Sequence, residues 1–500
     1  MNVTMLLDMA AEGFGDRVVV GGGPDGLTAS RLRELAIGGA GEVSAADADA
    51  VLYLGVNGPA FPVAMFAAAR AGVPLVPVNY RLGRERLDRL LAGHPGAYAI
   101  ADEDHFEVLR QAGLRARTPA EFLAAAGSGP VGAEEPAETG APAVVIYTSG
   151  TTSEPKGVLL HHRNLVSYVL GSVEFAAAGE DEAALMSVPP YHIAAVSNVL
   201  TNLYAGRRFI ALPSFSPLGW LETVREQRVT NAMVVPTMLA RIMDADGLDR
   251  SVPSLRSLAY GGARTPPRVI ERALAEWPHV GFVNAYGLTE TSSTIAVLGP
   301  EEHRAALASG DPAVRARLGS AGRPVPAVEL EIRDEAGGVL PSGETGRIWV
   351  RGEQVSGQYA GRGPATDERG FFDTRDRGRL DVGGYLFVEG RVDDTIIRGA
   401  ENIAPAEIED VLLRHDGVAD AVVVGVPDEE WGQRIEAVVV PEPGSDVDVE
   451  ALREHVRAAL RGSRTPDRIA CWPELPRTPT GKILRHDVVR GLTGERNAVP

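Results

Sequence analysis

The segment AVVIYTSGTTSEPKGV, residues 143–158, joins an apolar run directly to a loop of small polar residues. Val144 to Tyr147 are the β-branched and aromatic residues of a buried strand, and Thr148 to Thr152 are all small. Small residues leave backbone N–H groups and hydroxyls accessible, and Lys156 then adds a point charge. We therefore expect this strand and loop to form a cradle for nucleotide phosphates, at one edge of an α/β sheet.

Two alternatives compete with that interpretation. Loops rich in Thr and Ser are usually only solvated turns, and the spacing from Gly150 to Lys156, with Pro155 before the lysine, does not match a Walker motif. The use of lysine argues against the solvated turn. The chain has 49 Lys plus Arg residues, of which only Lys156 and Lys482 are lysine. A compact ammonium can turn toward two crowded anionic oxygens, whereas a planar guanidinium fork cannot.

Composition narrows the functional class. The 500 residues are 44% hydrophobic and 23% charged, which is typical of globular proteins, and the net charge of −18 argues against general binding of nucleic acid or membranes. Cys471 is the single cysteine, so no intrachain disulfide is expected, and a reducing, cytoplasmic location fits best. The N-terminus lacks the basic start of a signal peptide, and no run is long enough for stable membrane insertion.

The order of apolar runs predicts the fold class. Through about residue 390, strand patterns such as residues 49–56 and 207–212 alternate with helical patterns such as 60–72 and 218–229, which predicts an α/β domain with largely parallel sheets. Residues 116–143, rich in Ala, Gly, Pro and Glu, are interpreted as a surface linker. We expect domain 1–390 to be followed by a small mobile α+β domain, 391–500.

A glycine-rich motif near the N-terminus is interpreted as a turn. GGGPDG, residues 21–26, matches the dinucleotide-binding pattern formally, but Asp25–Gly26 is itself a hairpin-turn signal. Its function is therefore expected to be structural.

Polar residues in three later segments could complete a nucleotide site. Tyr286 beside Gly287 could offer a flat ring to a purine, and Thr289 and Glu290 could offer oxygens to phosphate and Mg²⁺. An aspartate such as Asp376 can accept from both hydroxyls of a ribose. Taken singly, these residues are as readily explained by a strand-to-loop transition or a solvated surface.

In this order the segments resemble the adenylate-forming superfamily of acyl-CoA synthetases, carrier-domain adenylating enzymes and luciferases. The resemblance covers nearly the whole chain. It rests on YTSGTTSEPKG (phosphate loop), YHIAAVSN (acyl pocket), YGGA and NAYGLTE (adenine and Mg²⁺), TRD (ribose), GRVDD (hinge), RGAENI (pantetheine loop) and PRTPTGK (catalytic lysine).

The resemblance implies the following roles for residues of this chain. Catalysis would involve Lys482, Glu290, Thr289 and His192, with Glu290 and Thr151 at the metal. ATP or AMP would contact Thr148, Ser149, Gly150, Thr151, Thr152, Lys156, Gly261, Gly262, Ala263, Asn284, Tyr286, Gly287, Asp376 and Arg391. The hinge would be Asp393, CoA would contact Arg398, Gly399, Ala400 and Glu401, and the acyl pocket would include His192, Ala195, Val196 and Ser197.

The implied reaction has two steps. A carboxylate attacks the α-phosphorus of MgATP to give an acyl-adenylate, and after rotation of the small domain about Asp393 the thiol of CoA displaces AMP. Lys482 would neutralise charge at phosphorus in the first step. CoA is favoured over a carrier protein because no carrier domain follows in the sequence, and a homodimer is left open. Small residues near the acyl segment suggest a bulky or medium to long hydrophobic acid.

Three residues depart from the family pattern, where glycine is usual. They are Ser153, Arg375 and Ala400. Side chains at these positions restrict positive φ and crowd the phosphate and ribose sites. Two alternatives therefore remain. The chain could only thioesterify a preformed acyl-adenylate, or it could be a non-catalytic nucleotide-binding homologue.

Overall fold

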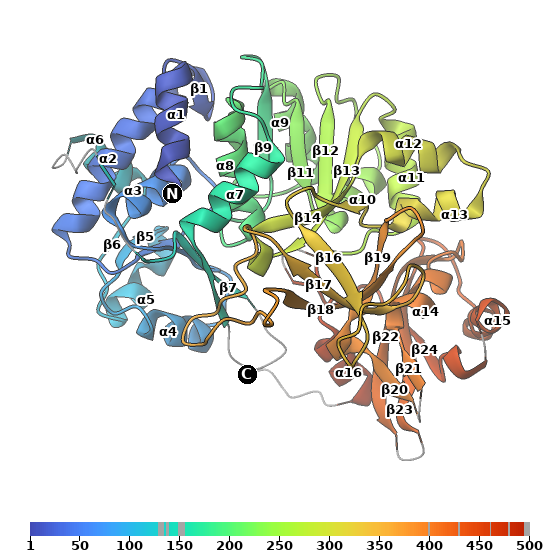
Figure 1. Ribbon diagram of the computed structural model, residues 1–500. Coiled ribbons are helices and arrows are strands. Elements are labelled where there is room, and N and C mark those ends of the chain that lie inside the picture. The colour runs from blue at the N-terminus through green and yellow to red at the C-terminus, as the bar shows by residue number, and fades with distance from the viewer. Residues whose placement is uncertain are drawn as a thin grey trace.

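The computed structural model describes residues 1–500 except 129–134, 137–139, 149–155, 399–400, 429–430, 461, 479–480 and 495–500. Figure 1 shows a large N-terminal body of helices and sheets and a smaller C-terminal body beneath one side of it. The predicted α/β class, with largely parallel sheets and a small second body, is confirmed.

The elements of the large body alternate as the sequence pattern predicts. Its helices are α1 (Thr4–Phe14), α2 (Ala29–Ala45), α3 (Ala60–Ala71), α4 (Arg84–Ala92), α5 (Phe106–Gln111), α6 (Pro119–Ser128), α7 (His162–Ser172), α8 (Ile193–Ala205), α9 (Pro217–Glu226), α10 (Pro236–Asp244), α11 (Pro267–Glu276), α12 (Pro300–Ala308) and α13 (Pro312–Arg315). Its strands are β1 (Val18–Val20), β2 (Leu27–Thr28), β3 (Val51–Leu54), β4 (Leu75–Pro77), β5 (Tyr98–Ala101), β6 (Ala116–Arg117), β7 (Val144–Thr148), β8 (Lys156–Leu160), β9 (Ala183–Met186), β10 (Arg208–Ala211), β11 (Asn231–Val234), β12 (Ser257–Gly261), β13 (Gly281–Leu288), β14 (Ser293–Leu298) and β15 (Arg323–Pro324).

The remaining chain is mostly antiparallel. It comprises β16 (Glu329–Arg333), β17 (Gly346–Arg351), β18 (Phe372–Leu380), β19 (Leu386–Arg391), β20 (Ile396–Arg398), β21 (Glu401–Ile403), α14 (Pro405–Leu412), β22 (Val418–Asp428), β23 (Gly432–Pro441), α15 (Val449–Ala459), β24 (Arg468–Cys471) and α16 (Arg485–Thr493). Short 3₁₀ turns include η3 (Thr289–Thr291) and η5 (Val392–Asp394).

Two sheets form the frame of the large body. One has the strand order β15-β14-β13-β12-β11-β9-β10-β1-β2 and the other β6-β5-β3-β4-β7-β8, and their central strands are parallel. Residues 60–70 of helix α3 are all buried, so this helix has no solvent face to pattern. Parallel central strands direct their carboxyl ends to one edge of the sheet, which is where ligand sites of open α/β sheets lie.

The C-terminal body has an apolar core of its own. Buried Val, Ile and Leu residues of β22, β23, α14 and α15 pack together without contributions from the large body. This separation supports the predicted boundary near Gly390–Asp393, which stays a prediction.

Several contacts link the bodies in the orientation seen here, among them those of Arg264, Arg268 and Gly481. Arg264 donates from Nη1 to the carbonyl of Ala406 over 3.0 Å and pairs with Asp410. Gly481, with φ of +83°, lies against Thr237 of α10, so close that a Cβ would come 2.4 Å from the threonine Oγ1. Only glycine satisfies both the positive φ and this contact. The segment carrying Lys482 therefore packs directly on the large body.

The structure tests the predictions for two glycine-containing segments, the turn at residues 21–26 and the linker at 116–143. The turn at residues 21–26 is confirmed, because β1 and β2 on either side of it pair antiparallel. The linker over 116–143 is wrong for its first half, where Pro119–Ser128 forms α6. Phe122 of α6 is fully buried against Gly39 of α2. Alanine-rich sequence with one buried aromatic makes a good helix once a partner surface is present.

Phe122→Ala tests whether α6 is part of the core. Removing a fully buried phenylalanine should destabilise the large body by about 3–5 kcal/mol and lower its melting temperature. Leu170→Ala, at a side chain that is 47% exposed, is the matched control and should change little. Equal melting temperatures for Phe122→Ala and the parent protein would mean that α6 contributes nothing to the core.

Candidate active site

The carboxyl ends of β12 and β13 form one wall of the candidate site. Gly261 lies opposite Ala285 in register, and a Cβ on Gly261 would come 2.1 Å from the Ala285 carbonyl oxygen. Gly287 is equally restricted, since a Cβ there would meet the carbonyl of Ser293. These glycines let neighbouring backbones approach closely. Gly262 has φ of +85°, and Ala263 follows it at the end of β12.

A buried carboxylate lies beside this wall. Asp376 of β18, only 6% exposed, accepts a hydrogen bond from the Tyr286 hydroxyl at Oδ2 over 2.6 Å. Its Oδ1 lies 3.0 Å from Nη1 of Arg391, its register partner on β19. The sequence thus placed Asp376, Arg391 and Tyr286 in one site, and the structure brings them into contact.

Opposing effects act on the Asp376 carboxyl. Burial raises its pKa above the ordinary value, whereas Arg391, the Tyr286 hydroxyl and Lys482 lower it. Burial, and then the Asp376 charge, also raise the pKa of Tyr286 well above its ordinary value. The tyrosine hydroxyl therefore keeps its proton and remains a donor.

Lys482 approaches this cluster from the C-terminal body. Its ammonium is exposed, yet it is close enough to Asp376 to lower the pKa of that carboxyl. The backbone around it is fixed by hydrogen bonds from Lys482 N to Thr478 Oγ1 and from Thr478 N to the Lys482 carbonyl. A positive charge carried by the small body thus acts on a buried carboxylate of the large one.

Glu290 has a partner that the sequence interpretation missed. It lies with Thr289 in η3, and its Oε1 accepts a hydrogen bond from the Tyr359 hydroxyl over 2.8 Å. Tyr359 stands between Gly357 and Gly361, and an aromatic residue among glycines was the available signal. A single carboxylate oriented by a tyrosine fits Mg²⁺, which proteins usually hold through one or two carboxylates together with the phosphates of a substrate.

The phosphate loop is only partly described. Thr148 ends β7 and pairs with Lys156, which starts β8. Ser149, Gly150, Thr151 and Thr152, with the departure at Ser153, lie outside the described residues. The strand and the lysine on either side of that segment therefore face each other across one hairpin.

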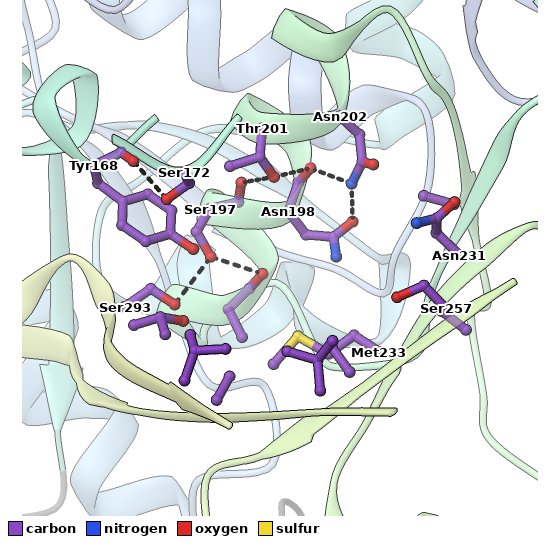
Figure 2. A pocket seen from close by; sticks show the side chains of 18 of the residues that line it. Tyr168, Ser172, Ser197, Asn198, Thr201, Asn202, Asn231, Met233, Ser257 and Ser293 are labelled. Carbon is purple, nitrogen blue, oxygen red and sulfur yellow. Dashed lines mark hydrogen bonds between the residues drawn. The ribbon is translucent and has the colours of Figure 1, made fainter. Parts of the chain in front are cut away.

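A cavity of about 310 Å³ lies beneath the wall, between α8 and the strands β9 and β11–β14 (Figure 2). Apolar lining comes from Ala259, Val283, Ala285, Met233 and Val297. Polar lining comes from Ser197, Asn198, Thr201, Asn202, Asn231, Ser257 and Ser293. Such a volume lies at the small end of ordinary ligand sites.

Of the residues assigned to an acyl pocket, only Ser197 lines this cavity. Ala195 and Val196 are fully buried in the core instead. The reason is helical geometry, since positions 194, 197, 198 and 201 share one face of α8 and the two residues between do not. Ala194 and Asn198, not Ala195 and Val196, therefore face this cavity, and the acyl assignment stays a prediction.

His192 lies outside the cavity lining, at the N-cap of α8. Its ring contacts Tyr191, and burial, assisted by Arg81, lowers its pKa to about 4, so the ring is neutral at pH 7. Asn284, assigned to nucleotide binding, instead donates to the Ser320 carbonyl over 2.8 Å.

The residues assigned to CoA lie apart from the cluster. Arg398 and Glu401 pair across β20 and β21, which Figure 1 places at the lower end of the small body. Arg398 bonds Asp467, and Glu401 accepts from Arg464. Gly399 and Ala400 lie outside the described residues. In this orientation the charge of Lys482 acts on Asp376, while Arg398 and Glu401 are paired with Asp467 and Arg464.

Arg375 and the predicted hinge residue are neighbours. Arg375 adopts φ of +59°, where glycine is favoured, and its exposed guanidinium lies 3.8 Å from the Asp393 carboxylate. The side chain is therefore directed to Asp393, while Asp376 keeps Tyr286 and Arg391 as partners.

Tyr286→Phe tests the buried carboxylate. The hydroxyl donates to ionised Asp376, so its loss should cost about 1–3 kcal/mol of unfolding free energy at neutral pH. Because the pKa of Asp376 is raised, its ionisation itself costs stability as pH rises from the ordinary carboxyl value through the raised one. Phenylalanine raises that pKa further. The stability gap between variant and parent should therefore be small in acid and widen toward neutral pH.

Urea denaturation at several pH values between 4 and 8 measures this gap. Tyr385→Phe, which removes a half-buried hydroxyl bonded to Glu302 outside the cluster, is the control. A gap for Tyr286→Phe that does not change with pH would contradict the assigned hydrogen bond.

Comparison with known proteins agrees with this geometry. Residues 8–360 match the AMP-binding enzyme family, and residues 407–482 match the AMP-binding enzyme C-terminal domain. A feruloyl-CoA synthase from Amycolatopsis sp is 37% identical over 88% of each chain, and a fatty acid–[acyl-carrier-protein] ligase, ScoC, from Streptomyces coeruleorubidus is 32% identical over 89% of this chain and 86% of its own.

Solved structures are similar over the whole chain. One is o-succinylbenzoate CoA synthetase from Bacillus subtilis with its acyl-adenylate intermediate, at a TM-score of 0.83 and 27% identity, covering 99% of this chain and 98% of its own. Another is the amide bond synthetase McbA from Marinactinospora thermotolerans, at 0.86 and 28%, covering 98% and 100%. Among the described residues, no helix is both long and apolar enough to cross a membrane. The chain belongs to the AMP-binding, adenylate-forming enzyme family, as its sequence motifs predict.

Proposed function

We propose that this protein is an ATP-dependent acid–thiol ligase that activates a carboxylic acid as its adenylate and transfers the acyl group to CoA. One observation carries the proposal most directly. The charge of Lys482, supplied by the small body, lowers the pKa of the buried Asp376 carboxyl, and Ala285, the neighbour of Tyr286 in that cluster, lines the cavity. The feruloyl-CoA synthase and o-succinylbenzoate CoA synthetase among the relatives support CoA as the acceptor.

The first step joins acid and nucleotide. A carboxylate oxygen of the acid attacks the α-phosphorus of MgATP, and the bond to pyrophosphate breaks. Asp376 accepts from the ribose hydroxyls, Arg391 fixes that carboxylate, and Glu290 holds the Mg²⁺ that arrives with ATP. Lys156 and the adjoining loop bind phosphate oxygens. Lys482 neutralises the charge that develops between the carboxylate and the α-phosphate.

Tyr286 has a second role in addition to the contact with adenine that the resemblance implies. Its hydroxyl is committed to Asp376, so the ring is held in a fixed orientation beside Gly287. We infer that the ring face contacts adenine while its edge positions the ribose carboxylate. Gly261 to Ala263 complete the base site.

The second step needs a different orientation of the small body. The CoA residues Arg398 and Glu401 lie away from the cluster here, so rotation about Asp393 brings them to the cavity while Lys482 withdraws. The sulfur of CoA then attacks the acyl carbon. The bond between that carbon and the phosphate oxygen breaks, so AMP leaves and keeps the oxygen. His192, neutral because of its lowered pKa, lines the route from cavity to thiol.

The acid is proposed to be bulky or of medium to long chain, with a hydrophobic body. The alanine, valine and methionine side chains along the cavity support an apolar body. An acid panel that includes fatty and aryl acids, assayed for pyrophosphate release and thioester formation, measures this directly. Thioester from supplied acyl-AMP without exchange between ATP and pyrophosphate would favour the single-step alternative. Neither activity, despite AMP binding, would favour the non-catalytic one.

Lys482→Ala should suppress the first step far more than the second. Its ammonium acts only while charge develops at phosphorus, so pyrophosphate exchange should fall by at least about a hundred-fold. Thioester formation from a supplied acyl-adenylate should be nearly unchanged. Lys482→Arg should restore little exchange, because a guanidinium fork does not turn between two crowded oxygens.

Arg490→Ala, at an exposed charge on α16 of the same body, is the control and should leave both steps intact. Equal loss of both steps in Lys482→Ala, or full exchange in Lys482→Arg, would contradict the role given to the lysine.

A further inference from the structure

The cavity beneath the strand ends is chemically divided along its length. Ser257 begins β12 and Gly261 ends it, so about four residues at roughly 3.3 Å each separate the two ends of the cavity wall. Apolar residues, among them Ala259 and Ala285, line the middle of the wall, and Ser293 and Thr294 line its nucleotide-facing end, where β14 pairs with the last residues of β13. At the far end Asn231 and Ser257 stand side by side in register. An acid lying with its carboxylate at the nucleotide therefore directs its other end to polar groups.

A chain of hydrogen bonds orients the amides at that far end. Arg207 is paired with Glu182, with Nη2 2.9 Å from Oε2, and donates from Nη1 to Oδ1 of Asn202 over 2.9 Å. Because arginine can only donate, the Asn202 oxygen must face it and its nitrogen must face away. That nitrogen donates to the carbonyl and to Oδ1 of Asn198, over 2.8 and 2.9 Å.

The hydrogen bond from Asn202 also fixes the orientation of the Asn198 amide. With its Oδ1 accepting from Asn202, its Nδ2 is left as a donor. Figure 2 shows this nitrogen turned toward the side of the cavity where Met233 lies. Within the described part of the chain, no group accepts a hydrogen bond from it. The cavity thus presents an oriented amide N–H₂ to whatever occupies its far half.

The charge at that end is already balanced. Arg207 is the one charged residue that lines the cavity in the described chain, and Glu182 neutralises it at hydrogen-bond distance. A second carboxylate on the acid would therefore lose hydration without gaining a free positive charge. An uncharged oxygen, in contrast, could accept from Asn198 at little cost.

We propose that the acid carries an uncharged hydrogen-bond-accepting oxygen, such as an ether, hydroxyl or carbonyl, at the end distant from its carboxylate. The Nδ2 group of Asn198 donates a hydrogen bond to this oxygen. This inference rests on the proposed function and names the substrate class of the same site. It refines the hydrophobic acid to one with an apolar middle and a polar, uncharged end. Asn202 and Arg207 act as positioning residues for Asn198.

The test compares acids that differ only in that oxygen. The probes are 3-phenylprop-2-enoic acids with a methoxy, ethyl or carboxylate group at ring position 3 or 4, and kcat/KM is measured by pyrophosphate release. Methoxy and ethyl have nearly the same size, so their ratio isolates the acceptor oxygen. One hydrogen bond in a buried site should favour the methoxy acid by about ten-fold at one of the two positions. The carboxylate acid should be the poorest.

Two variants assign the preference to Asn198. Asn198→Leu removes the amide, and Asn198→Asp keeps the acceptor for Asn202 while replacing the donor nitrogen with oxygen. Either should bring the methoxy-to-ethyl ratio to about one. Thr201→Val is the matched control, because the Thr201 hydroxyl lines the same cavity but already bonds the Ser197 carbonyl over 2.8 Å. It should retain the parent ratio. Thermal melting checks that each variant folds.

The outcomes separate the two claims. An ethyl acid activated as well as the methoxy acid at both positions contradicts this inference alone, as does a preference that persists in both Asn198 variants. No pyrophosphate release with any acid, fatty acids included, contradicts the proposed function and this inference with it.

Discussion

The ion pair and hydrogen bond on the Asp376 carboxylate are the constraint on which the site depends. Burying a carboxylate is costly unless charge and donors surround it, and Arg391 and Tyr286 offset part of that cost at Asp376. These two residues come from different sheets, since Tyr286 belongs to β13 and Arg391 to β19. The bonds of Asp376 to Tyr286 and Arg391 therefore join the antiparallel sheet to the large, mostly parallel sheet, at strand β13, whose Ala285 lines the cavity.

This arrangement explains why the small body matters. Arg391 is the last residue of β19, and the predicted hinge at Asp393 follows within the next turn. The residue that fixes the carboxylate thus stands at the root of the small body, and Lys482 at that body's far end returns to the same carboxylate. In the proposed rotation about η5, Lys482 would withdraw while Arg391, which lies before the hinge, keeps its pair with Asp376.

Much of this could be predicted from sequence because the chemistry is carried by short segments. Strand and helix periodicity indicated the α/β layering, and the motifs around Tyr286, Asp376 and Lys482 indicated residues that the structure brings together. The direction in which each side chain of a helix points was harder to predict than the helix itself. Ala195 and Val196 were assigned to the acyl pocket, whereas the cavity found here is lined by positions 194, 197, 198 and 201 of α8. Partners such as Tyr359 of Glu290 come from distant segments, which periodicity cannot pair.

The effect of replacing a usual glycine, as at Arg375, also could not be predicted without the structure. Arg375 does adopt the positive φ that favours glycine, so the expected backbone strain is real, yet its side chain turns to Asp393 and not to the ribose carboxylate. Sequence reasoning treated residues 116–143 as linker because alanine and glycine dominate there. It could not anticipate that Gly38 and Gly39 of α2 open space for α6 and Phe122.

The most direct measurement of the central claim is calorimetric binding of AMP, 2′-deoxy-AMP and 3′-deoxy-AMP to the parent protein and to Asp376→Asn. If the Asp376 carboxylate accepts from the ribose hydroxyls, the parent should lose affinity for each deoxy analogue by about ten-fold or more, and Asp376→Asn should bind AMP weakly with little distinction among the three. Equal affinities of the parent for all three nucleotides, or undiminished AMP binding by Asp376→Asn, would contradict the account.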